Sequence, residues 1–301
     1  VPGWMGICPV QVFISDEKQI EGGISKMSQE YNPSWNVMQL FRLDGKWAFV
    51  TGGARNLGFD MALALAEAGA NVIVTSRSAD SARESAQLIS KYTGQKAIGM
   101  ALDVRNEQEI QDTVEKILAE TGRIDILVNN AGNVTSTPEN APFNKRPLTL
   151  WQEVIDTNLT GSFLCAKHVT DAYMIPNKTG VIINLGSTAG IIGKDRRVYE
   201  GTPMGGATLD YHAAKGGVIN MTRDMAAYLA PYNIRVNCIS PGGFFRNQPQ
   251  AFVDAYSQTF PMGRMGMDGK EMKGAAVYLA SEASSFVTGH NRVVDGGLTI
   301  W

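Results

Sequence analysis

Apolar residues recur along this chain in two alternating patterns. Short runs made mainly of Val, Ile, Leu and Ala are separated by stretches in which apolar residues repeat every three or four positions. The first pattern is typical of strands buried on both faces of a parallel sheet, and the second of amphipathic helices. Seven strands are predicted, over 47–50, 71–75, 97–102, 124–128, 181–184, 234–239 and 292–294.

Helices are predicted between most of these strands. In the first, Leu57, Met61 and Leu65 form one apolar stripe, and Gly69 follows as a helix-ending residue. Alternating strands and helices predict an α/β protein: a doubly wound Rossmann fold whose mainly parallel seven-stranded sheet has helices on both faces. Further helices are predicted over 81–91, 107–120 and 211–225.

The pattern runs from about residue 43 to the end without an internal repeat or a linker rich in Pro or Ser. We therefore predict a single domain over 43–301, preceded by an N-terminal arm over 1–42. Within the arm, Met27 heads a segment that suits a natural start, and Glu21–Gly23 could be encoded by a ribosome-binding sequence. Residues 1–26 are predicted to be a start-site artefact, with a genuine flexible arm as the alternative.

Composition narrows the class of protein. Apolar residues make up 44% of the 301 positions and charged residues 19%, which supports a folded core and excludes a disordered chain. A net charge of −2 gives no electrostatic basis for binding nucleic acid. No apolar run reaches the length of a membrane span, and the three cysteines are too widely spaced for a disulfide framework or metal site. We predict a cytoplasmic protein without a nucleic acid, membrane or metal partner.

A glycine-rich segment, Thr51-Gly-Gly-Ala-Arg-Asn-Leu-Gly58, lies between the first predicted strand and the first helix. A dinucleotide pyrophosphate needs close backbone approach and the free N–H groups of a helix N-terminus at this place. The residues predicted to bind the cofactor here are Gly52, Arg55, Asn56, Leu57 and Gly58.

This segment resembles the Thr-Gly-x-x-x-Gly-x-Gly fingerprint of the single-domain branch of the short-chain dehydrogenase/reductase family. Asn56 stands where the family has its middle glycine. Because Asn is the non-glycine residue that best tolerates left-handed backbone, the turn is expected to persist. The resemblance covers about residues 43–301 and implies a Rossmann-fold oxidoreductase that binds NAD(P).

The cofactor preference is predicted from the end of the second strand. An acidic residue about 20 positions after the fingerprint suits the 2′-hydroxyl of NAD, whereas an arginine suits the 2′-phosphate of NADP. Ser76 and Arg77 stand here, without a carboxylate between residues 71 and 79, and Arg55 adds a second guanidinium. NADP(H) is therefore favoured, with NAD(H) as the alternative if Arg77 is an ordinary solvated charge.

Later segments match the family in the same order along the chain. The ends of the third and fourth strands resemble the parts that contact adenine and the adenosine ribose, and the segment after the sixth strand resembles the nicotinamide-side loop. Arg246 stands where the family commonly has a threonine. The residues assigned to the cofactor by this resemblance are Asp103, Val104, Asn130, Ala131, Gly132, Pro241 and Gly242.

A tyrosine and a lysine four residues apart, Tyr211 and Lys215, share one face of a predicted helix. A phenol has a pKa near 10, and a fixed cation beside it lowers that pKa. The same spacing joins Tyr92 to Lys96, but Gly94 interrupts that segment in a connection between a helix and a strand. We predict that Tyr211 transfers the proton and that Lys215 lowers its pKa. The resemblance implies that both residues also contact the cofactor, Lys215 through the nicotinamide ribose.

Two other residues complete the predicted catalytic set. Ser187 follows the fifth strand and resembles the family serine that orients the reacting oxygen. Asn158 resembles the helix asparagine that holds a relay water near the lysine. Together with Tyr211 and Lys215, these residues imply reversible hydride transfer between a secondary alcohol and nicotinamide.

The separation of 24 positions between Ser187 and Tyr211 is longer than the family usually shows. The resulting loop, 191–210, is predicted to overhang the site, and 243–265 to form a second substrate loop. The charged residues of the loop 191–210, together with Arg246, indicate an anionic or polyhydroxylated ligand. The alternative is that this loop is solvated or contacts another subunit. The charged residues in the first loop are Lys194, Asp195, Arg196, Arg197 and Glu200.

Two segments, Leu40–Lys46 and Val294–Trp301, resemble the gluconate 5-dehydrogenase branch, which implies a sugar, sugar acid or polyol substrate. A 3-oxoacyl-thioester reductase shares every motif and is the alternative enzyme. A non-catalytic dinucleotide-binding sensor is the alternative of another class. The apolar C-terminal residues predict a subunit contact, and a homotetramer is expected.

Overall fold

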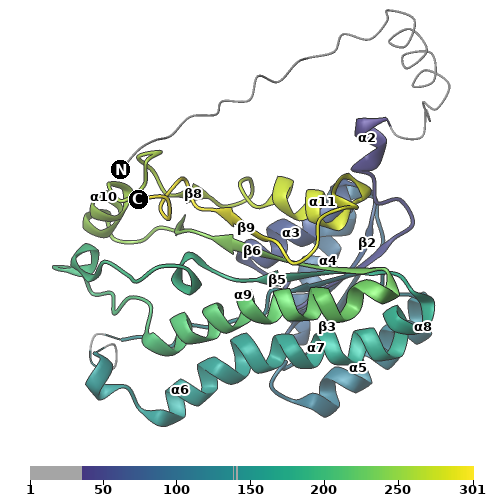
Figure 1. Cartoon of the computed structure of the whole chain (residues 1–301), viewed down its shortest axis with the longest axis horizontal. Helices are drawn as coiled ribbons and strands as arrows, with labels where there is room; N and C mark the ends of the chain where they lie inside the picture. The colour runs from purple at the N-terminus through teal and green to yellow at the C-terminus, as the bar shows by residue number, and fades with distance from the viewer. Residues whose placement is uncertain (1–35, 138, 140–141) are drawn as a thin grey trace, which may run out of the picture. The chain divides into compact units, whose positions relative to one another are not determined.

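Seven parallel strands form the central sheet of the computed structural model, which describes residues 36–137, 139 and 142–301 (Figure 1). The strand order is β3-β2-β1-β4-β5-β6-β9. The predicted doubly wound parallel sheet is confirmed, and each predicted strand boundary lies within two residues of the observed one. The strands are β1 Trp47–Val50, β2 Asn71–Ser76, β3 Ala97–Ala101, β4 Ile126–Asn129, β5 Gly180–Leu185, β6 Ile234–Pro241 and β9 Asn291–Val294.

Alternate residues of the central strands enter two separate hydrophobic cores. Val50 and Val128 pack in one core with helices α3, α4 and α11, and Phe49 and Leu127 pack in the other with α5, α7 and α9. Figure 1 shows these helix groups on opposite faces of the sheet. Because side chains alternate along a strand, runs that are apolar throughout require cover on both faces.

The helices follow the predicted periodicity, and two of them have side-chain caps at their starts. Ser78 caps α4 through a hydrogen bond from the Ser81 N–H, and the Asn106 side chain accepts from two N–H groups of α5. The helices are α2 Val37–Leu40, α3 Asn56–Glu67, α4 Ala79–Thr93, α5 Glu107–Thr121, α6 Leu148–Ile155, α7 Gly161–Val169, α8 Ile175–Asn177, α9 Leu209–Leu229, α10 Gln250–Ser257 and α11 Lys273–Ala280.

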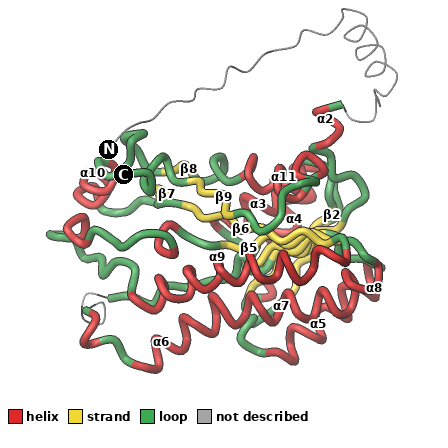
Figure 2. The backbone as a smooth tube through the Cα atoms, viewed as in Figure 1, coloured by secondary structure: helices red, strands yellow, loops and turns green. Residues whose placement is uncertain are grey.

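Two local features do not follow from the sequence pattern. Helices α6, α7 and α8 are joined by π-helical turns at Asp156–Thr160 and Thr170–Met174. A second, two-stranded parallel sheet pairs β7 (Phe244–Phe245) with β8 (Gly266–Met267), apart from the central sheet (Figure 2). The first of the two π-helical turns contains Asn158, and β7 and β8 lie in or next to the predicted substrate segment 243–265.

The residues Leu40–Trp301 form one compact unit. The proposed start at Met27 and the residues 1–26 lie outside the described part of the chain. The described helices include none with the length and apolar character needed to cross a bilayer. Within the described residues, His, Cys, Asp and Glu side chains form no group that could hold a metal ion.

Candidate active site

The predicted site residues gather at the carboxyl ends of the central strands. The chain runs from β1 outward to β3 and then returns to β4 on the other side of β1, so the strand order reverses between β1 and β4. Ligands of open α/β sheets bind outside such a reversal. The glycine-rich segment follows β1, and Asn130 follows β4.

The glycine-rich turn has the backbone that a phosphate cradle needs. Asn56 adopts a φ of +52°, so this asparagine takes the left-handed conformation of the glycine it replaces. At Gly58 a Cβ atom would lie 2.4 Å from the Gly52 carbonyl oxygen and 2.3 Å from the Asn130 Nδ2. Only glycine fits there, because the Asn130 Nδ2 donates hydrogen bonds to the Thr51 and Gly52 carbonyls at 2.9 Å each.

The N-terminus of α3 is suited to a pyrophosphate. Arg55, the residue before the helix, has an extended backbone and no side-chain cap, which leaves the first N–H groups without a side-chain acceptor. Arg55 and Arg77 are both exposed, and neither forms an ion pair with the described residues. The residues present therefore fit an anionic dinucleotide, and Arg55 and Arg77 would face its phosphates.

Asp103 has a partner that the sequence did not indicate. Its carboxylate accepts a bifurcated hydrogen bond from the single Nε–H of Arg105, with distances of 2.9 and 3.1 Å to its two oxygens. This pairing, with a smaller contribution from the positive charge of Arg77, lowers the pKa of Asp103. The Asp103 carboxylate is thus ionised. Part of its hydrogen-bonding capacity is used by Arg105 at the place where the contact with adenine was predicted.

Ser187 is held at the end of β5 in an extended conformation, where its hydroxyl accepts a hydrogen bond from the Ala189 N–H at 3.1 Å. Ser187 and Tyr211, which lies in the first turn of α9, line the same cavity. The other Tyr-x-x-x-Lys tyrosine, Tyr92, ends α4 and is 65% exposed. Only Tyr211 of these two tyrosines lies beside a hydroxyl group in a cavity.

The ionisation of Tyr211 differs from the sequence-based expectation. Burial raises the pKa of Tyr211, while a hydrogen bond with Ser187 and the positive charge of Arg246 lower it. The Lys215 Nζ lies 5.6 Å from the centre of the Tyr211 ring and donates to the Leu185 carbonyl at 2.7 Å. Burial lowers the pKa of Lys215 to about 8. The pKa of the Tyr211 phenol therefore stays above its usual value, because desolvation outweighs the hydrogen bond with Ser187 and the charge of Arg246.

Asn158 lies within the π-helical turn between α6 and α7 and is fully buried. Its Nδ2 donates to the Asn133 and Val154 carbonyls, at 2.9 Å each. Its Oδ1 accepts no hydrogen bond from the described residues. A π-helical turn inserts one residue and re-aims side chains, and such turns are frequent at functional sites. The relay role implied by the family resemblance stays a prediction.

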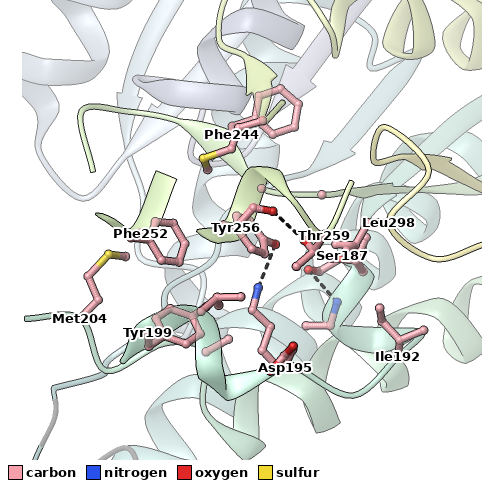
Figure 3. A pocket seen from close by; sticks show the side chains of 18 of the residues that line it. Ser187, Ile192, Asp195, Tyr199, Met204, Phe244, Phe252, Tyr256, Thr259 and Leu298 are labelled. Carbon is pink, nitrogen blue, oxygen red and sulfur yellow. Dashed lines mark hydrogen bonds between the residues drawn. The ribbon is translucent and has the colours of Figure 1, made fainter. Parts of the chain in front are cut away.

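The cavity has a volume of about 610 Å³ and is built largely by the two predicted substrate loops (Figure 3). Three aromatic rings that line the cavity stack in sequence, those of Tyr199, Phe252 and Tyr256, with centroid distances of 5.2 and 5.0 Å. The first ring comes from the loop 191–210 and the others from the segment 243–265. Phe260 lies behind them and meets the Tyr256 ring edge to face, with the ring centroids 5.0 Å apart.

The charges of the first loop divide between cavity and solvent. Lys194 lines the cavity and donates a hydrogen bond to the Tyr256 hydroxyl at 2.8 Å. Arg196 and Arg197 are exposed, and Arg197 pairs with Asp195 at 2.8 Å. The position of the two adjacent arginines in the sequence had suggested that they would line the cavity. They do not line it. The turn Arg196–Tyr199 directs them outward.

Arg246 also lines the cavity, but it forms a two-point ion pair with Asp268, at 2.6 and 2.9 Å. Of the residues assigned to the nicotinamide side, Gly242 lines the cavity, and its N–H donates to the Val294 carbonyl at 3.0 Å. Pro241 ends β6 next to it. The sequence did not reveal the aromatic stack, although Phe252 and Tyr256 stand four residues apart, the spacing of one helix face.

The comparisons with known proteins agree with the fold and the motifs. A family model described as enoyl-(acyl carrier protein) reductase matches residues 52–299. The chain belongs to the short-chain dehydrogenase/reductase family, and it is an oxidoreductase that acts on CH–OH groups and uses NAD(P).

Particular relatives carry more specific names. The chain is 38% identical to the 2-dehydro-3-deoxy-D-gluconate 5-dehydrogenase of Formosa agariphila (87% of this chain, 95% of that protein). It is 37% identical to the 5-keto-D-gluconate 5-reductase of Escherichia coli (87% and 98%). It is also 35% identical to a 3-oxoacyl-[acyl-carrier-protein] reductase of Chlamydia trachomatis (85% and 98%).

Among solved structures, the chain is similar to a gluconate 5-dehydrogenase from Burkholderia cenocepacia in complex with NADP and tartrate. The TM-score is 0.79 at 33% identity, over 88% of this chain and all of that chain.

Proposed function

We propose that this protein interconverts a keto sugar acid and the corresponding secondary alcohol, with NADP(H) as the preferred cofactor. The observation that carries the proposal is the cavity that Ser187, Tyr211 and Lys194 line together. Two hydroxyl groups suit a carbonyl oxygen, and a cation suits the carboxylate of the same molecule. The names of the gluconate-type relatives support this substrate class.

The roles of the residues follow from their chemistry in the direction of reduction. The Tyr211 phenol donates its proton to the carbonyl oxygen as that oxygen becomes an alkoxide. The Ser187 hydroxyl donates a hydrogen bond to the same oxygen. The bound nicotinamide would supply the hydride to the carbonyl carbon. The Lys215 ammonium stabilises the tyrosinate that remains, and solvent then restores the proton to Tyr211.

NADP(H) is proposed over NAD(H) because of two exposed guanidinium groups. Arg77 stands at the carboxyl end of β2, where the 2′-substituent of the adenosine ribose lies in this fold, and Arg55 precedes α3. An arginine binds a phosphate through two parallel hydrogen bonds, which a hydroxyl group cannot match. The NADP in the Burkholderia cenocepacia relative supports the same choice.

A 3-oxoacyl-thioester reductase is the second candidate, and the cavity walls favour it. The stacked rings, together with Met204, Met265 and Leu298, give an apolar lining that suits an acyl chain. However, a neutral acyl chain carries no negative charge that could pair with the Lys194 ammonium in the same cavity. A non-catalytic sensor is disfavoured because Tyr211, Lys215 and Ser187 all retain the side chains that catalysis needs.

The test follows NADPH oxidation at 340 nm with three substrates: 5-keto-D-gluconate, L-sorbose and an acetoacetyl thioester. We expect 5-keto-D-gluconate to give the highest kcat/KM, and NADH to support a lower rate than NADPH. If only the thioester were reduced, the substrate would be an acyl thioester and not a sugar acid. The proposed reaction, reduction of a ketone by NADPH, would still hold. No oxidation with any carbonyl compound, despite NADPH binding, would favour the sensor.

A further inference from the structure

The side chain of Lys194 lies against the aromatic stack of the cavity. Its Nζ is 4.0 Å from the centre of the Tyr256 ring and 5.6 Å from that of Tyr199. Figure 3 shows both rings, with a dashed line for the hydrogen bond from Lys194 to the Tyr256 hydroxyl. One N–H of the ammonium is thus used, and two remain for a ligand.

Lys194 has no carboxylate partner within the described part of the chain. The neighbouring Asp195 is already paired with Arg197 through hydrogen bonds from the guanidinium. The other cation of the cavity, Arg246, is paired with Asp268. Of the two cations that line the cavity, Lys194 alone keeps its charge free of an acidic side chain.

Burial makes this free charge costly. Desolvation lowers the pKa of Lys194 to about 8, and the charge of Asp195 offsets this only in part. A cation held in a partly apolar cavity gains more from an anion than one in water does, because the effective dielectric constant is lower. An anionic group that enters the cavity would therefore restore the favourable environment of the ammonium.

We propose that Lys194 is a specificity-determining residue that binds the carboxylate of the substrate and so selects keto acids over neutral ketoses of equal length. The inference rests on the proposed sugar acid oxidoreductase function. The carboxylate would accept hydrogen bonds from the two remaining N–H groups of Lys194, while the carbonyl to be reduced meets Ser187 and Tyr211. The stacked rings would pack against the carbon chain between these two ends.

The second loop holds the ammonium in place through Tyr256. The chain passes so close to this ring that a Cβ on Gly243 would lie 2.1 Å from the Tyr256 Cε1. Gly243 therefore allows the ring to reach its position beside Lys194. The carboxylate contact is built from both loops, and it lies in the segment where this chain has its long separation between Ser187 and Tyr211.

The test compares D-gluconate with D-glucitol, two compounds that differ only in a carboxylate or a CH₂OH group at one end. Calorimetric titration into the NADPH-loaded protein measures both dissociation constants, since the reduced cofactor cannot oxidise either alcohol. We expect the wild type to prefer D-gluconate by about tenfold or more, as a charge-assisted contact in a cavity predicts. We expect Lys194→Met to reduce this preference to within about threefold, since Met keeps the apolar contacts with the rings.

Two further variants separate charge from structure. Lys194→Arg retains the cation and should keep most of the preference for D-gluconate. Arg196→Met is the matched control, because it removes one positive charge from the exposed side of the same loop and should leave the preference unchanged. The proposal would be overturned if Lys194→Arg lost the preference for D-gluconate over D-glucitol while Lys194→Met kept it.

Two other outcomes would overturn the role proposed for Lys194. If D-gluconate binds equally to the wild type and Lys194→Met, the carboxylate contact with Lys194 is wrong, and reduction of 5-keto-D-gluconate by the wild type then decides the sugar acid function separately. If the wild type neither binds D-gluconate nor reduces 5-keto-D-gluconate, the proposed function fails, and the role of Lys194 toward sugar acids fails with it. The wild-type titration therefore distinguishes the two failures.

Discussion

At the scale of single residues, Arg77 is the side chain that most directly tests the proposed preference for NADP(H). Arg77 lies beyond the end of β2, is exposed, and has no ion pair with the described residues. Other exposed arginines near it are engaged, such as Arg105 with Asp103 and Arg83 with Asp80. An unpaired guanidinium at this position is available to a phosphate of the cofactor.

We expect Arg77→Ala to weaken NADPH binding by about tenfold or more, because a two-point contact with the 2′-phosphate is lost. NADH binding should change by less than about twofold, since NADH carries a hydroxyl there. Fluorescence titration of both cofactors measures the two constants. Equal losses for NADPH and NADH would mean that Arg77 does not contact the 2′-phosphate.

The residue scale also shows what sequence could and could not reveal about the site. Ser187, Tyr211 and the turn around Asn56 could be predicted, because their chemistry is tied to short motifs with fixed spacing. The inward direction of Lys194 could not, because it depends on one short turn that sends Arg196 and Arg197 outward. Neighbouring charges in a loop carry no period that separates an inner side from an outer one.

At the scale of elements, α9 begins with a buried ion pair that supports Tyr211. The Arg146 Nε donates to the Asp210 Oδ2 at 2.6 Å, and the Tyr211 N–H donates to the Asp210 Oδ1 at 2.8 Å. The side chains of Arg146 and Asp210 are 5% and 0% exposed. Removing one member of a buried pair leaves the other charge uncompensated.

We expect Asp210→Ala to lower the free energy of unfolding by about 3–5 kcal/mol and to reduce kcat through displacement of Tyr211. The matched control is Asp80→Ala, which breaks the exposed pair with Arg83 and should cost about 0–1 kcal/mol. Urea denaturation of the three proteins gives the values. A loss for Asp210→Ala no larger than that of the control would show that the buried pair does not hold α9.

The main elements could be predicted because their apolar periods are long enough to recognise, as in the stripe of Leu57, Met61 and Leu65. The strands β7 and β8 could not, because each has two residues and therefore no period. The π-helical turn around Asn158 differs from an α-helix by a single inserted residue, which the pattern does not register. The stacking of Tyr199 on Phe252 joins residues from different loops, and only the tertiary fold sets such a contact.

At the scale of the whole molecule, the C-terminal residues bear on assembly. Ile300 and Trp301 are 77% and 76% exposed, whereas Leu298 packs with the cluster around Phe252 and Tyr256. Contiguous apolar side chains at the surface, such as these two neighbours in the chain, are typical of subunit contacts. We propose a homotetramer on this basis, as expected from the sequence.

Light scattering should give about four times the 32.6 kDa mass of one chain. Replacing Ile300 and Trp301 together by serine should shift the protein toward smaller species, because the apolar contact area is reduced. A monomer at micromolar concentration in the wild type would remove the tetramer from the account.

The proposed reaction requires that Tyr211 protonate a carbonyl oxygen in the cavity between the two loops. The most direct measurement compares the wild type with Tyr211→Phe, which keeps the ring and removes only the hydroxyl. We predict that NADPH oxidation with 5-keto-D-gluconate falls by about 10²–10⁴-fold, the usual contribution of a positioned proton donor, while NADPH binding stays within about threefold. Activity within tenfold of the wild type would contradict the claim, because the proton would then come from another group.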